Sequence, residues 1–66
     1  MDQKIRDIIV EDVNIHSAAK IGKTFICPSG NKYAAGMWEV LDWDDKYHFF
    51  DDRKEALNFF FAINKV

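Results

Sequence analysis

The chain has 66 residues, a net charge of −2 and ten aromatic rings, a composition that suits one small folded domain over residues 1–66. A disordered chain would be poorer in rings, and a disulfide scaffold would need more than the single cysteine, Cys27. No apolar run approaches the ~20 residues of a membrane helix, and charges interrupt the N-terminal segment, so we expect a cytoplasmic protein without a signal peptide.

The first 22 residues fit two kinds of local structure. Apolar residues between positions 5 and 13 recur at nearly helical spacing, but the segment Ile8–Ile15 also fits a strand rich in β-branched residues. We favour a strand around Ile8–Ile15. Ser17 is then a candidate cap for a single helical turn, Ala18–Ile21, which Gly22 would end.

Two consecutive hairpins are predicted in the middle of the chain. The first joins a short strand, Lys23–Cys27, to the segment that leads into Trp38, and Pro28–Asn31 supplies its turn residues. The second joins Trp38–Trp43 to Tyr47–Phe50 through the polar turn at positions 44–46. Because both faces of the Trp38 strand are half apolar, we expect an inner strand that is covered on both sides.

A C-terminal helix is the clearest element. Asp52 and Glu55 form a capping box that predicts a helix from about Arg53 to Asn64. Phe59 and Phe61 flank its apolar face on opposite sides, and the apolar arc is wider than a helix on a sheet requires. One flanking ring would therefore be exposed, or covered by the N-terminus or by a second subunit, and we expect a homodimer.

The expected fold is α+β, with an antiparallel sheet of three to four strands packed against one C-terminal helix. Eight of the ten rings lie between Trp38 and Phe61, so the C-terminal half supplies most of the core.

Catalysis and cofactor binding find little support in the sequence. His16, Cys27 and His48 are isolated from one another, without the spacing of a metal site. No glycine-rich phosphate loop is present, and no nucleophile motif surrounds Cys27. A chain of this size can rarely spare a concave active site. We therefore expect no catalytic residue, no cofactor and no metal ion.

The charges are segregated along the chain. No acid occurs between Asp12 and Glu39, whereas the segment from Glu39 to Asp52 has six acids opposed by Lys46 alone. This segregation would create one positive and one negative surface if the fold kept the two hairpins apart. In the alternative interpretation, these charges only solvate turns and helix starts.

The acidic, aromatic second hairpin favours a non-catalytic protein that acts by protein–protein contact. Trp and Tyr are typical interface anchors, and carboxylates can meet a basic groove on a partner. Small acidic proteins of phages and mobile elements often inhibit larger host proteins in this way. The candidate partner-binding residues are Trp43, Asp44, Asp45, Tyr47, Phe59 and Phe61.

Nucleic-acid binding is the alternative, because lysines interleave with rings in the first hairpin and could bind phosphates while the rings stack on bases. The order of elements from Gly36 to Ala56 is similar in outline to plant ethylene-response and integrase arm-binding DNA-binding domains. Those families carry Arg and Lys where this chain has acids, so no functional residue is assigned from the likeness. The candidate nucleic-acid-binding residues are Lys20, Lys23, Phe25, Lys32 and Tyr33.

Overall fold

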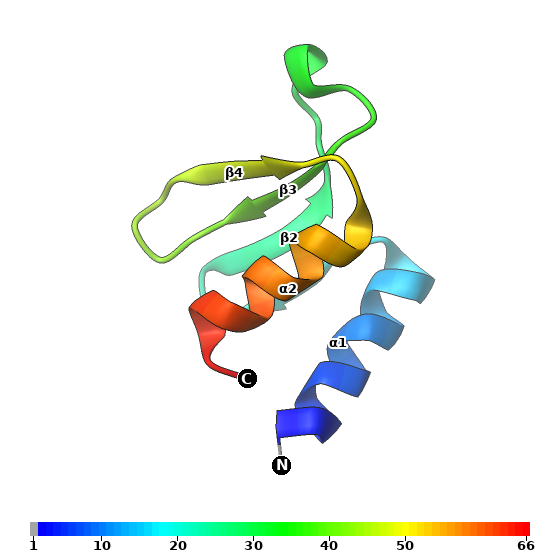
Figure 1. Cartoon of the computed structure of the whole chain (residues 1–66), viewed down its shortest axis with the longest axis vertical. Helices are drawn as coiled ribbons and strands as arrows, with labels where there is room; N and C mark the ends of the chain where they lie inside the picture. Colours follow the sequence, from blue (N-terminus) through cyan, green and yellow to red (C-terminus); the bar gives the residue numbers. More distant parts are fainter. Residues whose placement is uncertain (1) are drawn as a thin grey trace.

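The computed structural model describes residues 2–66 and contains two helices, a four-stranded sheet and one short 3₁₀ helix (Figure 1). The elements in chain order are α1 (Asp2–His16), β1 (Ala19–Ile21), β2 (Thr24–Pro28), the 3₁₀ turn η1 (Lys32–Ala34), β3 (Trp38–Leu41), β4 (Tyr47–Phe50) and α2 (Arg53–Asn64).

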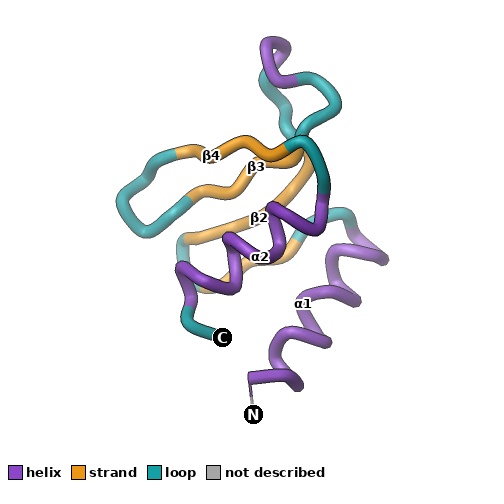
Figure 2. Tube along the Cα trace, viewed as in Figure 1, coloured by secondary structure: helices purple, strands orange, loops and turns teal. Residues whose placement is uncertain are grey.

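The sheet is an antiparallel meander in the order β1-β2-β3-β4, so each strand pairs with the next one along the chain. The helix α2 packs across β2, β3 and β4, and α1 packs beside it against β1 (Figure 2). The predicted α+β class, the antiparallel sheet and the C-terminal helix are confirmed, and the N-terminal helix is an addition.

The pairing register divides the strand residues between two faces, because side chains alternate along each strand. On the inner face, Ala19, Ile26, Val40 and His48 form one cross-strand row. On the outer face, the rows are Lys20-Phe25-Leu41-Tyr47 and Cys27-Glu39-Phe49.

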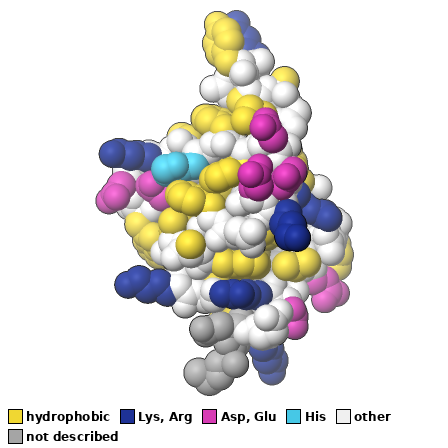
Figure 3. Space-filling model, viewed as in Figure 1, with side chains coloured by type: hydrophobic (Ala, Val, Ile, Leu, Met, Phe, Trp, Pro, Cys, Tyr) yellow, Lys and Arg dark blue, Asp and Glu magenta, His cyan; other side chains and the backbone are white. Residues whose placement is uncertain are grey.

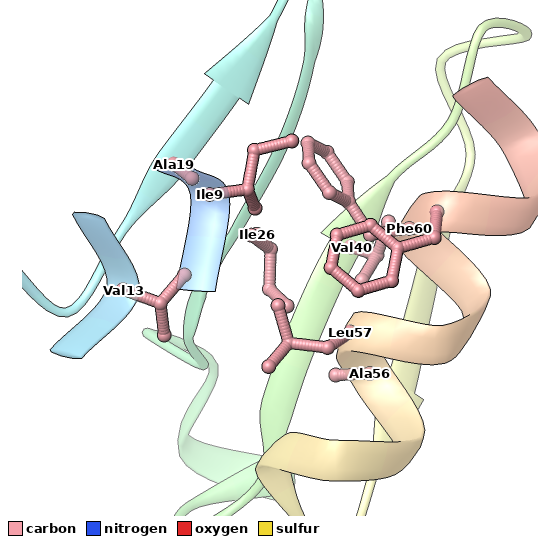
Figure 4. Close-up of a cluster of buried hydrophobic side chains, with 9 residues drawn as sticks. Ile9, Val13, Ala19, Ile26, Val40, Ala56, Leu57 and Phe60 are labelled. Carbon is pink, nitrogen blue, oxygen red and sulfur yellow. The ribbon is translucent and has the colours of Figure 1, made fainter. Parts of the chain in front are cut away.

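The hydrophobic core lies between the inner face and the two helices (Figure 4). Ile26 and Val40 from the sheet and Phe60 from α2 are fully buried. Ile9 and Val13 of α1 belong to the same cluster and are also buried. Burying a large apolar side chain stabilises the fold by roughly 1.5–3 kcal/mol, so this cluster fixes both helices on one side of the sheet.

The helix α2 begins and ends as its sequence predicts. Asp52 is extended at the N-cap, and its Oδ1 accepts from the backbone N–H of Glu55 at 2.8 Å. Lys65 adopts the left-handed conformation after the last turn, and its N–H donates to the carbonyl oxygen of Ala62.

The predicted strand at Ile8–Ile15 is wrong, because this segment belongs to α1. Ile9 and Val13 are four residues apart, so they share one helical face and both enter the core. A strand would bury Ile15 with them and place Glu11 on the same face, but Ile15 is 64% exposed. Docking of one helical face on the sheet therefore overrides the β-branched composition.

The predicted single turn at Ala18–Ile21 is also wrong. Ser17 adopts a left-handed conformation and its N–H donates to the carbonyl oxygen of Val13, so it ends α1. Residues 19–21 then pair with Thr24–Ile26 as β1, which satisfies their backbone groups across the sheet.

Neither of the two helices is long and apolar enough to cross a lipid bilayer.

Candidate functional site: the open face of the sheet

The outer face of the sheet is the candidate site, because both helices pack on the inner face. A sheet face in contact with water usually carries polar side chains. Here the outward positions of the strands are mostly apolar, and only Lys20 and Glu39 carry charge. We call this surface the open face, and its residues are Lys20, Phe25, Cys27, Glu39, Leu41, Tyr47 and Phe49. The expectation that β3 is covered on both sides is therefore wrong: helices cover only one of its faces.

Three aromatic rings lie on the open face. The register places Phe25 and Tyr47 on either side of Leu41, and the two ring centroids are 6.1 Å apart in an edge-to-face arrangement. Phe49 stands directly opposite Glu39. Tyr47 is 54% exposed and Phe49 is 38% exposed, so both keep large apolar areas in contact with water.

Glu39 occupies the middle of the open face, with a small pocket beside it. The pocket has a volume of about 240 Å³ and is lined by Glu39, Tyr47, Phe49 and the loop residues Gly30 and Asn31. Glu39 is half-buried. The ion pairs found among residues 3–66 join Lys23 to Asp45 and His48 to Asp42, so the Glu39 carboxylate has no cationic partner in that part of the chain.

Cys27 lies next to this carboxylate, and its Sγ is 3.8 Å from the Glu39 Oε2. Burial, together with the neighbouring negative charge and the hydrogen bond to Glu39, raises the pKa of the Cys27 thiol. The thiol therefore stays protonated at neutral pH, whereas a catalytic cysteine needs the thiolate. In this arrangement the Cys27 thiol is a weak hydrogen-bond donor to Glu39.

A second, larger groove continues the open face toward α1. It has a volume of about 660 Å³ and lies where β2 extends beyond the shorter strand β1. Phe25 and Cys27 contribute to both surfaces, while Asp12 and His16 of α1 form the far wall. The accessible surface therefore extends from β4 to the C-terminal end of α1.

Two of the predicted partner-binding residues in the β3–β4 turn make contacts within the chain. The Trp43 Nε1 donates to the carbonyl oxygen of Ile63 at 3.2 Å, which ties the turn to the end of α2. The Asp45 carboxylate pairs with the Lys23 Nζ at 3.1 Å on the surface. Asp44 is exposed, and Tyr47 is the turn-proximal residue that reaches the open face.

The two flanking rings of α2 pack within the chain. Phe61 is buried, and the Arg6 guanidinium of α1 lies 5.4 Å from its ring centroid. Phe59 is half-buried, with its centroid 4.5 Å from the His48 ring and 5.3 Å from the Phe50 ring. The N-terminal helix and β4 therefore cover the rings on which the expectation of a dimer was based.

The candidate nucleic-acid residues do not form one surface. Lys20 and Phe25 are neighbours on the open face, but Lys23 is paired with Asp45 at the end of the sheet near the β3–β4 turn. Lys32 and Tyr33 lie in the loop between β2 and β3, which projects from the opposite end (Figure 1). There the Lys32 Nζ is 5.2 Å from the Tyr33 ring centroid.

The two segregated charge segments do not produce two separate surfaces. Pairing of β2 with β3 joins the hairpins, and Lys23–Asp45 connects the basic segment to the acidic one. On the helix-covered side of the molecule, acidic and basic side chains are interspersed around the apolar ones (Figure 3). Charge alone therefore does not single out a binding surface.

Sequence reasoning selected Tyr47 and Phe25 but missed their neighbours Glu39, Leu41 and Phe49. The alternation in Tyr47-His48-Phe49-Phe50 could have indicated that Tyr47 and Phe49 share a face. Within residues 3–66, no group of three His, Cys, Asp or Glu side chains is placed to hold a metal ion.

No protein-family model, curated protein or solved structure matches the chain.

Proposed function

We propose that this protein is a non-catalytic binding protein that acts by protein–protein contact through the open face of its sheet. The observation that carries the proposal is the exposure of Tyr47 and Phe49 beside Phe25 and Leu41 on a face that neither helix covers. Contiguous apolar surface on a small domain marks an interaction site. Aromatic side chains are enriched at the centres of protein interfaces, where they bury large areas with little loss of entropy.

The charge of the open face favours a protein partner over a nucleic acid. Lys20 at one edge is its single cation, and Glu39 lies near its middle. Nucleic-acid affinity depends on several cations close to the phosphates. A half-buried carboxylate among the rings would repel those phosphates, so the rings suit a protein surface better than a strand of bases.

A chain of this size acts most simply by occupying a surface of a larger protein. We propose that it is a stoichiometric inhibitor or modulator of such a protein, of the kind that phages and mobile elements encode, and that it acts in the cytoplasm. An open sheet face of seven outward residues can fill the centre of an interface of standard size, with the turn acids Asp44 and Asp45 at its rim.

The double variant Tyr47→Ala/Phe49→Ala tests the proposal. The full chain is used to capture partners from the source cell, each captured protein is purified, and its affinity is measured by calorimetry. The variant should weaken binding by at least about 2 kcal/mol, since central aromatic residues carry most interface energy. The control is Asn58→Ala, which removes an exposed side chain from α2 on the other side of the sheet and should leave the affinity unchanged.

Equal affinity of the double variant and the wild type would contradict the proposal, provided that both give the same far-ultraviolet spectrum. Tight, salt-sensitive binding of DNA or RNA would favour the alternative function instead. Sedimentation velocity distinguishes a second copy of the chain as the occupant, because a face-to-face homodimer would form without any other protein.

A further inference from the structure

We infer that the pocket beside Glu39 receives an arginine side chain of the partner protein. This inference rests on the proposed function and names the chemical group that the open face recognises. The pocket combines one carboxylate, from Glu39, with two aromatic side chains, from Tyr47 and Phe49. A carboxylate next to aromatic rings is the environment that binds a cation.

The Glu39 carboxylate is available for this role. It is half-buried on the face that the helices leave open, and within residues 3–66 its hydrogen-bond partner is the weak donor Cys27 Sγ at 3.8 Å. Half-burial removes part of its water, so a charged donor from outside would strengthen its hydrogen bonding and neutralise its charge. The exposed acids of the turn, by contrast, are already hydrated or paired with Lys23.

The geometry of the pocket favours arginine. Phe49 lies directly across from Glu39, and Tyr47, two residues before Phe49, is on the same face of β4. A guanidinium group can stack flat on such rings while it donates two N–H groups to one carboxylate. Lysine would offer a compact, strongly hydrated charge, which makes less use of the rings.

The same charge argues against a second copy of the chain as the occupant. In a two-fold dimer whose axis passes through the pocket, the Glu39 carboxylates of the two protomers would approach each other without a compensating cation. Lys20 lies at the far end of the neighbouring row, separated from Tyr47 by Phe25 and Leu41. A partner that brings its own cation solves this problem.

The test is a titration of the isotope-labelled full chain with N-acetyl-arginine amide, followed by ¹H–¹⁵N correlation spectra. Saturable shifts are expected at Glu39, Tyr47, Phe49 and Asn31. The neutral isostere N-acetyl-citrulline amide should produce no saturable shift at these positions. Glu39→Gln should raise the Kd for the arginine probe about two- to fivefold, as expected for loss of a partly exposed charge pair.

Two further variants make the result specific. Asp44→Asn removes an equal charge from the exposed turn and should leave the Kd unchanged. Phe49→Leu keeps an apolar side chain but removes the ring, and it should weaken binding of the probe by about two- to fivefold. This second pocket variant tests the proposal even if Glu39→Gln perturbs the fold.

Equal binding of the arginine and citrulline probes, or equal effects of Glu39→Gln and Asp44→Asn, would overturn the inference. That result is distinguishable from failure of the proposed function. If Tyr47→Ala/Phe49→Ala abolishes partner binding but Glu39→Gln does not, the open face is the interface and the arginine assignment is wrong. If neither variant affects partner binding, the proposed function itself is wrong.

Discussion

Asp42 holds the β3–β4 turn together through three acceptor contacts. One carboxylate oxygen accepts from the backbone N–H groups of Asp44 and Lys46 at 2.7 and 3.0 Å, and the other is 2.7 Å from the His48 Nε2. The hydrogen bond with His48, followed by those with the Lys46 and Asp44 backbone, lowers the pKa of the Asp42 carboxyl. The ionised form therefore stabilises the fold.

We predict that Asp42→Asn lowers the free energy of unfolding at neutral pH. A lowered pKa in the folded state gives stability that is present above the ordinary value of 3.8 and is lost as the pH falls through the lowered value. The difference between wild type and variant should therefore shrink as the pH is lowered from about 5 to about 2.5. Urea denaturation at several pH values measures this difference. A difference that stays constant over this range would contradict the assignment.

Gly22 is the second residue on which this end of the sheet depends. Its φ is +59°, and an added Cβ would lie 2.6 Å from the Cη2 of Trp43. Gly36 has a φ of +83° but open space around it. The two positions therefore separate the cost of the backbone conformation from the cost of displacing the indole.

We predict that Gly22→Ala destabilises the protein more than Gly36→Ala does. A left-handed alanine costs roughly 1–2 kcal/mol, and this cost applies at both positions. At position 22 the methyl group would also displace Trp43 and break its hydrogen bond to Ile63, so thermal unfolding should show a further loss of about 1 kcal/mol. Equal losses for the two variants would show that Trp43 does not pack on Gly22.

At the scale of elements, the placement of α1 determines which surfaces remain free. Its buried face carries Ile9 and Val13, and Arg6 extends the contact to α2 through the Phe61 ring and the carbonyl oxygen of Val66. Without α1, Phe61 and the inner face of β1 would be exposed to solvent. Phe61, which was expected to bind a partner, is therefore part of the core.

A pair of identical substitutions tests this placement. Ile9→Ala should destabilise by about 2–5 kcal/mol, because Ile9 is 5% exposed in the core. Ile15→Ala should change stability by less than about 0.5 kcal/mol, because its side chain is 64% exposed. In a strand, positions 9 and 15 would share a face and both variants would be costly. Chemical denaturation of the two variants therefore separates the helix from the strand.

The elements that were predicted correctly carry strong local signals, whereas the local signals of α1, which was predicted as a strand, are ambiguous. The helix α2 begins at a capping residue whose contact with Glu55 is local, and the β3–β4 hairpin has a polar turn between aromatic strands. The segment of α1 is rich in β-branched residues, three of which are exposed isoleucines. Its apolar residues also have nearly helical spacing, and docking against the sheet decides in favour of the helix.

At the scale of the whole molecule, the site was predictable only in part because it is a product of strand register. Tyr47 is aromatic and lies next to a turn, so it could be selected from the sequence. Its neighbours Phe25 and Leu41 come from two other strands, and only the pairing of β2, β3 and β4 brings them into one row. A shift of one residue would move each of them to the other face.

The two-layer architecture leaves one face of the sheet uncovered. Because both helices pack on the inner face, the aromatic outer face is in contact with solvent. The exposed side of α2, which includes Asn58, lies on the other side of the sheet. A partner that binds the open face would therefore leave this side of α2 accessible.

Site-directed photo-crosslinking in the source cell tests whether the open face is the interface. The photoreactive residue p-benzoylphenylalanine replaces Phe49 on the open face, and in a matched protein it replaces Asn58 on the exposed side of α2. We predict that irradiation joins the protein to one discrete larger partner when the probe is at position 49, and not when it is at position 58. A discrete product from position 58, with none from position 49, would contradict the proposed interface.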